Sequence, residues 1–335
     1  MIIIAEIGVN HNGSFELAKE LIEKAALAGA DVVKFQTFKA EDNISKFAEM
    51  ATYQKNNLQK ESSQLEMVQK YELSNNEFVK LSKVANLNNI SFLSTAFDLN
   101  ALQFLDSLEM EYLKVASGEI TNLPLLEEIG KRNKKVLLST GMANTQEIDD
   151  AITIISSNGT PRDKITILQC TSQYPAPDKD INLNAMLDLG REFNLKYGLS
   201  DHSEGIIASL AAVTLGASVI EKHITLDKAL PGPDHKASID IKELNDLIFL
   251  ARRIEIQMGS NVKKLTESEI NTKQVARKSI VAANNIKEGD VITKNNILVK
   301  RPGIGISPMD FYKILGKVAK KDIEKDRVIF YEDIE

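Results

Sequence analysis

The segment Val219-Ile220-Glu221-Lys222-His223 is apolar where it begins and charged where it ends. We expect a β-strand, in which alternation places Glu221 and His223 on one face and Lys222 on the other. The strand-like run before it, Lys196–Leu199, leads into Ser200-Asp201-His202. Two imidazoles beside carboxylates at successive strand ends suit a divalent metal ion, Mn²⁺ or Zn²⁺, with positions left open for a substrate. The alternative is a pair of core histidines that cap turns.

Short β-rich runs of this kind alternate with longer amphipathic segments through the first 260 residues. Strands that alternate with helices form parallel βαβ units, and eight such units predict a closed (β/α)8 TIM barrel of the α/β class rather than an open sheet. The eight expected strands are Ile2–Ile7, Val32–Gln36, Ser91–Thr95, Tyr112–Val115, Lys135–Ser139, Ile165–Cys170, Lys196–Leu199 and Val219–His223. The expected helices include Phe15–Ala28, Leu123–Lys131, Thr145–Ser156, Ile206–Leu215 and Phe78–Ala85, the last preceded by an N-capping box of Ser74 and Glu77.

Polar side chains are expected to collect at the carboxyl ends of the strands, because the active site of such a barrel lies there. All eight strands end in residues of this kind. They are Glu6, Lys34, Gln36, Ser94, Thr95, Lys114, Ser117, Glu119, Ser139, Thr140, Thr171, Tyr174, Ser200, His202, Glu221 and His223. The general polarity of loops accounts for the serines but not for the lysines.

Lys34 and Lys114 each lie within an apolar run, so their ammonium groups are expected to point into the barrel mouth. A cation buried there is costly unless an anion meets it. A structural ion pair with Glu6 or Glu119 would meet this need without a ligand. Two inward lysines also suit an anionic substrate.

The sequences Ser117-Gly118 and Ser139-Thr140-Gly141 favour the second of these interpretations. Glycine lets backbone N–H groups approach phosphate oxygens, and hydroxyl groups supply further donors. Together with the lysines, these segments at neighbouring strand ends predict a phosphorylated substrate.

Length and composition restrict the classes of protein. The 335 residues allow one large core and a small second domain. A net charge of −6 gives no reason to expect nucleic acid or an anionic membrane as a partner. The single cysteine, Cys170, excludes an internal disulfide, and the apolar start Met1–Ala5 is too short for a signal peptide or a membrane span. We therefore expect a cytoplasmic protein.

A long polar stretch, Glu41–Lys70, follows the second strand and contains Gln54, Gln59, Gln64 and Gln69. It is too long for an ordinary connection, so it predicts an excursion over the barrel mouth, such as a lid. A solvated pair of helices is the alternative.

The remaining chain differs from the barrel in composition, and we expect domains at residues 1–260 and 279–335 joined by a linker at 261–278. The tail contains an internal repeat, which predicts a small pseudo-symmetric β domain. Its apolar residues Val281-Ala282, Ile286, Val291-Ile292 and Ile297 recur 37 residues later as Val318-Ala319, Ile323, Val328-Ile329 and Ile334. So small a core is expected to dock on another surface, such as a second subunit. Arg301, framed by Pro302 and Gly303 between the two halves, is a candidate to reach into an active site.

Taken together, the motifs resemble those of the sialic acid synthase family. Members of this family make nine-carbon nonulosonic acids from phosphoenolpyruvate and a six-carbon N-acetylamino sugar. The resemblance covers nearly the whole chain, and the tail resembles the antifreeze-like (SAF) domain that these synthases carry. The matching segments are Ala5–Gly13, Val33–Thr37, Ser117–Glu119, Leu138–Met142, Cys170-Thr171, Tyr174-Pro175, Gly198–His202, Glu221–His223, Gly232–His235 and Lys300–Gly303.

The resemblance implies a domain-swapped homodimer in which the arginine loop of each subunit completes the site of the other. It also implies that His202 and His223 bind Mn²⁺, and that Glu6, Glu119 and Glu221 are the acid–base groups. Phosphoenolpyruvate would be surrounded by Lys34, Thr95, Lys114, Ser117, Ser139, Ser172, Tyr174 and Ser200. The amino sugar would be held by Gln36, Asp234 and, from the other subunit, Arg301.

The reaction expected from the resemblance joins phosphoenolpyruvate to N-acetylmannosamine and gives N-acetylneuraminate and phosphate. Synthesis of legionaminate from 2,4-diacetamido-2,4,6-trideoxymannose is an alternative. A pyruvate-type aldolase that forms a Schiff base at Lys34 or Lys114 is a second alternative. A non-catalytic protein with an ice-binding or adhesive tail is a third, although inward lysines would have no purpose in a scaffold.

Overall fold

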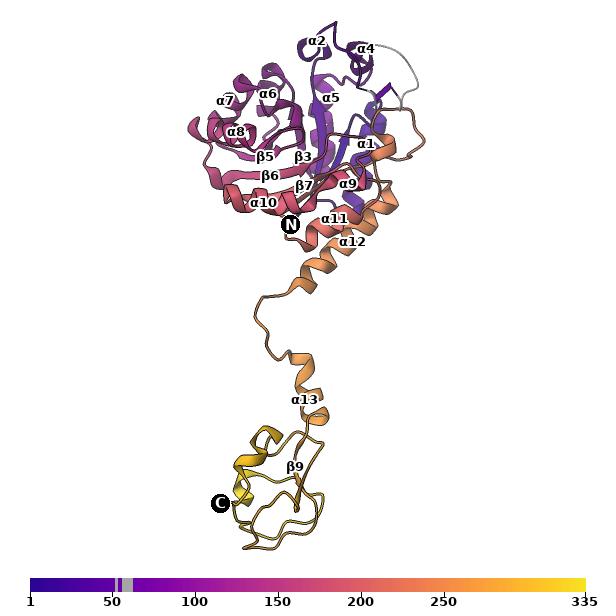
Figure 1. Ribbon diagram of the computed structural model, residues 1–335. Helices are drawn as coiled ribbons and strands as arrows, with labels where there is room; N and C mark the ends of the chain where they lie inside the picture. The colour runs from indigo at the N-terminus through magenta and orange to yellow at the C-terminus, as the bar shows by residue number, and fades with distance from the viewer. Residues whose placement is uncertain (52–53, 56–62) are drawn as a thin grey trace. The chain divides into compact units, whose positions relative to one another are not determined.

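The computed structural model describes residues 1–51, 54–55 and 63–335. Gln59 of the expected excursion falls outside the described residues. The chain forms two compact units, Met1–Gly259 and Ser260–Glu335, and each is described by itself (Figure 1).

The first unit is built on eight parallel strands arranged as a nearly closed barrel, which confirms the predicted fold. The ladder runs in the order β3-β2-β1-β8-β7-β6-β5-β4. Its two end strands, β3 and β4, lie in contact, and the Ser94 N–H at this seam donates to the Met110 sulfur at 3.2 Å. The strands are β1 (Ile2–Gly8), β2 (Val32–Thr37), β3 (Ser91–Ala96), β4 (Tyr112–Val115), β5 (Lys135–Ser139), β6 (Ile165–Cys170), β7 (Lys196–Asp201) and β8 (Val219–His223).

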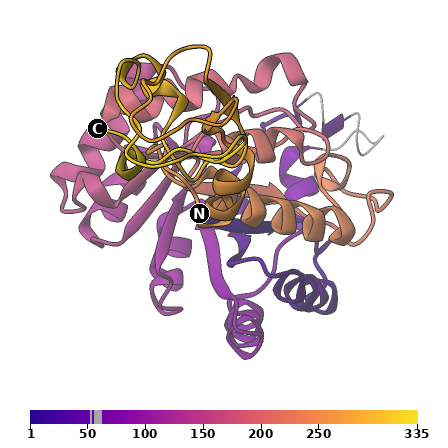
Figure 2. The same ribbon diagram turned by 90° about the horizontal axis from the view of Figure 1, so that it is seen from below.

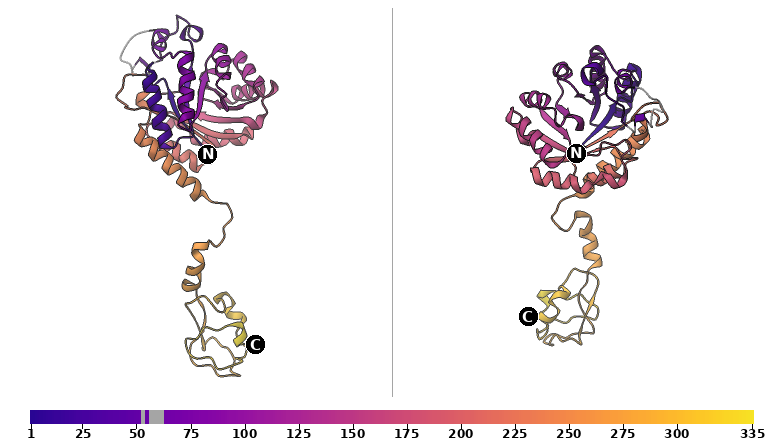
Figure 3. Two further views of the ribbon diagram at one scale, coloured as in Figure 1. Left: turned by 180° about the vertical axis from the view of Figure 1, so that it is seen from behind. Right: turned by 45° about the horizontal axis from the view of Figure 1, so that its top comes forward.

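Helices surround these strands on the outside (Figure 3). The predicted capping box before α5 is present, with Ser74 Oγ accepting the Glu77 N–H and the Glu77 carboxylate accepting the Ser74 N–H. The longer helices are α1 (Phe15–Ala28), α5 (Asn75–Leu87), α6 (Leu99–Asp106), α7 (Leu123–Lys131), α8 (Thr145–Ser157), α10 (Leu183–Phe193), α11 (Ile207–Thr214) and α12 (Ile241–Met258). Short helices are α2 (Ala40–Asn43), α4 (Gln64–Gln69) and α9 (Asp178–Ile181), with 3-10 turns at Ser117–Glu119, Arg162–Lys164 and His235–Ala237.

The core of this unit lies between the strands and the surrounding helices. Their apolar faces form one continuous buried cluster, in which Phe35 of β2 stacks on Phe92 of β3 with ring centroids 5.5 Å apart. The first and last elements of the unit are also joined, because the amino group of Met1 lies 2.8 Å from Glu255 Oε1 on α12. The barrel therefore presents a rigid ring of strand ends to whatever binds there.

The second unit contains only short regular elements among its loops (Figure 2). Its pairings follow the predicted repeat. Ile286 pairs with its own repeat partner Ile323, and their N–H groups and carbonyl oxygens bond reciprocally at 2.9 and 2.8 Å. Val281 pairs with Val328 and Val291 with Val318, as a two-fold axis through the Ile286–Ile323 pair requires.

Part of the expected linker is helical. The regular elements of the second unit are a 3-10 turn at Glu267–Glu269, α13 (Ile270–Ala276), β9 (Ser279–Ala282), β10 (Ile297–Lys300), and 3-10 helices at Pro308–Lys313 and Tyr331–Asp333. Within the described ranges, none of the helices has the length and apolar character needed to cross a membrane.

Candidate active site

A cavity of about 590 Å³ lies at the carboxyl ends of the barrel strands, and all eight strands or the loops that follow them contribute to its wall. Every predicted site residue of the first unit lines it: Glu6, Lys34, Gln36, Thr95, Lys114, Ser117, Glu119, Ser139, Ser172, Tyr174, Ser200, His202, Glu221, His223 and Asp234. Arg301 belongs to the second unit, and its role stays a prediction.

Two lysines and two glutamates form a buried charged cluster at the bottom of this cavity. Lys34 Nζ lies 2.9 Å from Glu6 Oε2 and donates to Thr95 Oγ1 at 3.1 Å. Oε1 of Glu221 lies 3.6 Å from the Nζ atoms of both lysines and accepts the Ser200 hydroxyl at 2.9 Å. The ion pair expected between Lys34 and Glu6 is therefore present, and Glu221 lies between the two ammonium groups.

Burial and mutual attraction set the charges of this cluster. Burial raises the pKa of Glu6 to about 7, although the charge of Lys34 partly offsets it. Burial acts in the same direction on Glu221, but Lys114 and Lys34 outweigh it and its pKa is lowered. Burial lowers the pKa of Lys114, whereas for Lys34 the nearby Glu221 and Glu6 outweigh burial and raise the pKa. Glu6 is thus the carboxyl group here that can take up and release a proton near neutral pH.

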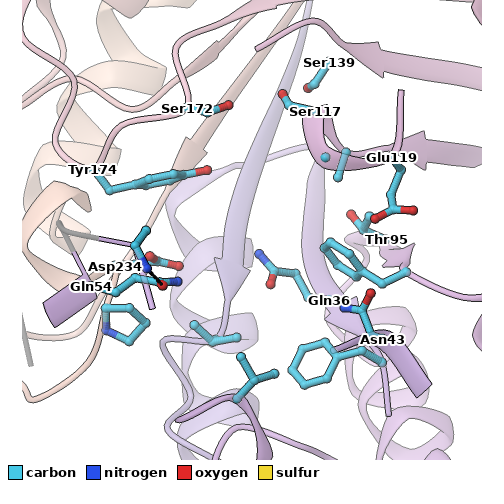
Figure 4. Close-up of a pocket in the computed structure, with 18 of the residues that line it drawn as sticks. Gln36, Asn43, Gln54, Thr95, Ser117, Glu119, Ser139, Ser172, Tyr174 and Asp234 are labelled. Carbon is cyan, nitrogen blue, oxygen red and sulfur yellow. Dashed lines mark hydrogen bonds between the residues drawn. The ribbon is translucent and has the colours of Figure 1, made fainter. Parts of the chain in front are cut away.

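Three serine hydroxyls meet at one end of the cavity (Figure 4). Ser139 Oγ accepts from Lys114 Nζ at 2.8 Å, and Ser117 Oγ accepts from the Gly141 N–H at 3.0 Å. Gly141 is required by this packing, because a Cβ atom there would lie 2.3 Å from Ser172 Oγ and 2.8 Å from Ser117 Oγ. Hydroxyl groups beside an ammonium group make this end of the cavity suitable for a phosphate group.

His202 and His223 lie side by side in the cavity, with ring centroids 5.5 Å apart and the ring planes at 64° to each other. Tyr174 stacks on His202 at 4.1 Å. Nδ1 of His202 lies 2.8 Å from the Thr171 carbonyl oxygen, so this nitrogen is the donor and a metal ion would bind at Nε2. Burial lowers the pKa of this imidazole, but the nearby Cys170 and the Thr171 carbonyl outweigh it and raise the pKa, so a metal ion would compete with a proton here. On the other side, Gly8 has a φ of +53° and lies so close that a Cβ atom would approach His223 Cε1 to 3.3 Å.

These two side chains have the features expected of metal ligands. Nδ1 of His223 is buried without a hydrogen bond among the described residues, and burial keeps the pKa of this imidazole well below its usual value, so it is neutral. A backbone carbonyl that orients a histidine, as for His202, is a common outer partner of metal sites. Within the described part of the chain no group of three or more His, Cys, Asp or Glu side chains could hold an ion. Two imidazoles would therefore leave most coordination positions to substrate and water.

The opposite part of the cavity carries amide and carboxyl groups from β2 and from segments that follow the strands. Figure 4 shows Gln36, Asn43, Gln54 and Asp234 away from the three serines. Burial raises the pKa of Asp234 to about 6. The sequence analysis did not single out Asn43, and it noted Gln54 only within the glutamine-rich stretch, which does border the cavity through its described residues.

One wall of this part is apolar. Val9, Phe38, Met67, Val68 and Phe97 line the cavity and belong to a small hydrophobic cluster separate from the main core. These residues come from β1, β2, α4 and β3 or the loops after them. Sequence reasoning missed this wall because the contributing loops show no periodic pattern.

Three polar residues expected at the strand ends have structural partners and do not line the cavity. Ser94 Oγ lies 2.7 Å from Thr37 Oγ1, Thr140 Oγ1 donates to the Leu168 carbonyl oxygen, and Thr171 Oγ1 donates to that of Asp180. Glu119 lines the cavity half-buried and accepts from Asn122 Nδ2 at 2.6 Å. Burial raises its pKa.

Comparison with known proteins agrees with this geometry. The family model described as the NeuB family matches residues 21–263, and that of the SAF domain matches residues 277–335. The chain is 50% identical to an N,N'-diacetyllegionaminic acid synthase of Campylobacter jejuni, with 98% of each chain covered. It is 43% identical to the enzyme of the same name from Legionella pneumophila, over 99% of this chain and 94% of that one.

A solved structure supports the same assignment. The sialic acid synthetase of Leptospira borgpetersenii, crystallised with citrate, superimposes with a TM-score of 0.72 at 35% identity, over 81% of this chain and 89% of that one. The chain therefore belongs to the NeuB family, the synthases of nonulosonic acids, and carries a SAF domain after its barrel.

Proposed function

We propose that this enzyme condenses phosphoenolpyruvate with 2,4-diacetamido-2,4,6-trideoxymannose and releases N,N'-diacetyllegionaminic acid and phosphate. The observation that carries this choice of sugar is the apolar wall of Val9, Phe38, Met67, Val68 and Phe97. Compared with N-acetylmannosamine, the proposed sugar has a methyl group in place of a hydroxymethyl group and an acetamido group in place of a hydroxyl. An apolar wall favours the methyl groups, because a hydroxyl buried there without a partner is costly. The names of the two legionaminic acid synthases to which the chain is similar support the same choice.

Phosphoenolpyruvate would bind between the lysines and the three serines. Lys114 and the hydroxyls of Ser117, Ser139 and Ser172 are grouped at one end of the cavity, where they suit the phosphate. Lys34, beside Thr95, would neutralise the other end of the anion. Donors fixed before the reaction stabilise the charge that phosphate gains as it leaves.

Carbon 3 of phosphoenolpyruvate attacks the aldehyde carbon of the open-chain sugar, water adds to carbon 2, and the C–O bond to phosphate then breaks. His202 and His223 would hold Mn²⁺, which when bound polarises the aldehyde oxygen as a Lewis acid. The water that adds to carbon 2 must lose a proton to a carboxylate within hydrogen-bond reach. Glu6 suits that role best, because its pKa near 7 allows it to exchange protons at neutral pH.

The sugar would lie in the part of the cavity with Gln36, Asp234, Asn43 and Gln54. We further propose that Arg301 reaches this site from the other subunit of a homodimer. N-acetylmannosamine, the sugar expected from the sequence, is the second candidate. The amide and carboxyl groups at this end, which suit free hydroxyls, favour it.

The test measures phosphate release from phosphoenolpyruvate with each of the two sugars, with added Mn²⁺ and with EDTA, followed by mass spectrometry of the product. We expect release that requires both a sugar and a metal ion, with the diacetamido sugar at least tenfold better in kcat/KM. A higher kcat/KM for N-acetylmannosamine would refute the proposed substrate. Release that persists in EDTA would refute the metal requirement. Trapping of a lysine adduct by borohydride without phosphate release would instead establish the aldolase.

A further inference from the structure

Asp201 and Lys222 form a buried ion pair directly behind the two candidate metal ligands. Each residue immediately precedes a histidine, Asp201 before His202 and Lys222 before His223. The two lie opposite each other in the β7–β8 ladder. Both side chains are fully buried, and Lys222 Nζ lies 3.1 Å from Asp201 Oδ2.

The pair lies on the outer face of the barrel wall. His202 and His223 line the cavity and their predecessors do not, as strand alternation requires. Asp201 Oδ2 accepts the hydroxyl of Ser209 at 2.6 Å. Ser209 belongs to α11, which packs against both strands. The ion pair is therefore enclosed between the strands and this helix.

The same network holds the backbone on both sides of His202. Asp201 Oδ1 accepts the Ser203 N–H at 2.8 Å and the Ser203 hydroxyl at 2.6 Å. Lys222 Nζ donates to the Ser203 carbonyl oxygen at 2.5 Å. The carbonyl oxygen of His202 itself accepts the Ala176 N–H at 2.9 Å. The Cα position of His202 thus has little freedom relative to Lys222, and so relative to His223.

Stability alone does not account for such a pair. Two charges removed from water lose about as much solvation energy as their attraction returns, and apolar replacements of similar volume are often neutral or stabilising. Unlike an apolar contact, the ion pair and its hydrogen bonds are directional. They therefore fix the register and the rotation of β7 relative to β8. That register sets the distance between the two imidazoles.

We propose that the Asp201–Lys222 pair is a positioning device that holds His202 and His223 at the separation needed to share one divalent metal ion. Neither residue touches the ion or the substrates. The inference rests on the metal site proposed above. It extends that proposal to residues on the far side of the strands.

The test compares metal affinity with stability in the full-length protein. The variants are Lys222→Met, Asp201→Asn and the double variant with both changes. Arg132→Met is the control, since it breaks an ion pair with Asp106 (2.8 Å) on the outside of the barrel, away from the cavity. Apo protein is titrated with Mn²⁺ while free Mn²⁺ is measured by electron paramagnetic resonance, and thermal unfolding is recorded for each variant without metal.

We expect Lys222→Met to weaken Mn²⁺ binding about tenfold or more. This is the lower end of the loss in affinity that follows mutation of residues supporting metal ligands. Lys222→Met leaves Asp201 with its three hydrogen-bond donors, so it should fold. Asp201→Asn leaves a buried ammonium unpaired and should lower the melting temperature most. The double variant should recover most of that stability but not the affinity. The control should bind Mn²⁺ as the wild type does.

Equal Mn²⁺ affinity in the wild type, Lys222→Met and the double variant would overturn the inference and leave the metal site intact. Affinity that follows the melting temperature, including a loss in Arg132→Met, would also overturn it, because the effect would then be general destabilisation. His202→Ala and His223→Ala are titrated in the same way, and Mn²⁺ binding that neither change weakens, or no binding by the wild type, would reject the metal site itself and the inference with it.

Discussion

The Nζ atom of Lys34 lies 2.9 Å from Oε2 of Glu6, and both side chains are closed off from solvent. The ammonium therefore has a carboxylate partner in the absence of substrate. Because burial raises the pKa of that carboxyl to about 7, Glu6 can take up or release a proton near neutral pH while Lys34 keeps its charge. The cluster thus combines a fixed positive charge with a negative charge that protonation can remove.

Lys34→Met is expected to lower kcat/KM for phosphoenolpyruvate by about 10²-fold or more, because the bound anion would lose a buried charged partner. The variant should still fold, because Glu6 without its cation takes up a proton rather than remain a buried anion. Its melting temperature should therefore lie closer to that of the wild type at pH 6 than at pH 8. Phosphate release and thermal melts at the two pH values test both points. Lys39→Met, which removes an exposed lysine five residues later, is the control, and an equal loss of activity in it would contradict the assignment.

Gly141→Ala should raise the KM for phosphoenolpyruvate about tenfold or more while the KM for the sugar changes little. The added methyl would come within 2.3 Å of Ser172 Oγ, so this hydroxyl must move. The loss corresponds to one or two hydrogen bonds to a charged group. Steady-state kinetics with each substrate varied in turn measures the two constants.

The same displacement can be tested by a double variant. In a Ser172→Ala background the nearer of the two hydroxyl oxygens that the methyl strikes is absent and only Ser117 Oγ remains, so Gly141→Ala should cost less than in the wild type. Full additivity of the two changes would show that the glycine acts by some other means.

Val68→Thr should narrow or reverse the preference between the two sugars. Threonine has nearly the shape of valine but presents a hydroxyl to the apolar wall. We expect kcat/KM for the diacetamido sugar to fall about tenfold, and that for N-acetylmannosamine to be unchanged or to rise. Competition between the two sugars, with the products resolved by mass spectrometry, measures the ratio directly. An equal fall in kcat/KM for both sugars would mean that Val68 supports the structure of α4 and does not select between the sugars.

Two buried histidines that are neutral in the folded state are each expected to contribute stability that is lost between pH 6.5 and pH 4. Burial lowers the pKa of both His11 and His235 to about 4. In this window each of these histidines binds more protons in the unfolded chain than in the folded one, so its contribution to stability decreases as the pH falls. The raised pKa values of Glu6 and Asp234 act in the opposite direction, so the histidine contribution must be isolated by mutation. Each histidine contributes up to about 3 kcal/mol over the full window.

Urea unfolding of wild type and His11→Gln at pH 7 and pH 5 isolates this contribution. His11 Nδ1 accepts the Gly13 N–H at 3.0 Å, so an amide oxygen can replace it. The free energy of unfolding at pH 5, relative to that at pH 7, should be higher in the variant than in the wild type. An unchanged pH dependence would mean that His11 titrates normally in the folded protein.

Most of the barrel and many of its site residues could be predicted from the sequence because both depend on local pattern. Apolar runs ending in polar residues mark the strands of a barrel, and residues such as Lys34 and His223 are informative by their position in such runs. The relation between Glu221 and the two lysines could not be predicted. It depends on how β8, β2 and β4 face one another across the barrel, and no local pattern encodes that distance.

The sugar end of the cavity was least predictable for a similar reason. Asn43 ends the four-residue helix α2, Gln54 lies in the polar stretch that follows, and the apolar wall draws on four separate elements. The pairing of Asp201 with Lys222 could not be predicted from the sequence either. Alternation predicted that Lys222 faces away from the cavity, but its partner depends on the β7–β8 register.

The two-fold pairing of the second unit indicates which of its positions are constrained in sequence and which are not. Val281–Val328 and Val291–Val318 are the same contact made twice, so the unit resembles a homodimer fused into one chain, as a duplicated gene would produce. Each of these contacts joins a valine of one copy to a valine of the other. A substitution in one copy must therefore still pack against the other copy, and this limits how far the two copies can diverge in sequence. The segment between the copies, residues 298–317, is the join and has no counterpart. Arg301 lies in this join, where new side chains could be acquired without disturbing the symmetry of the core.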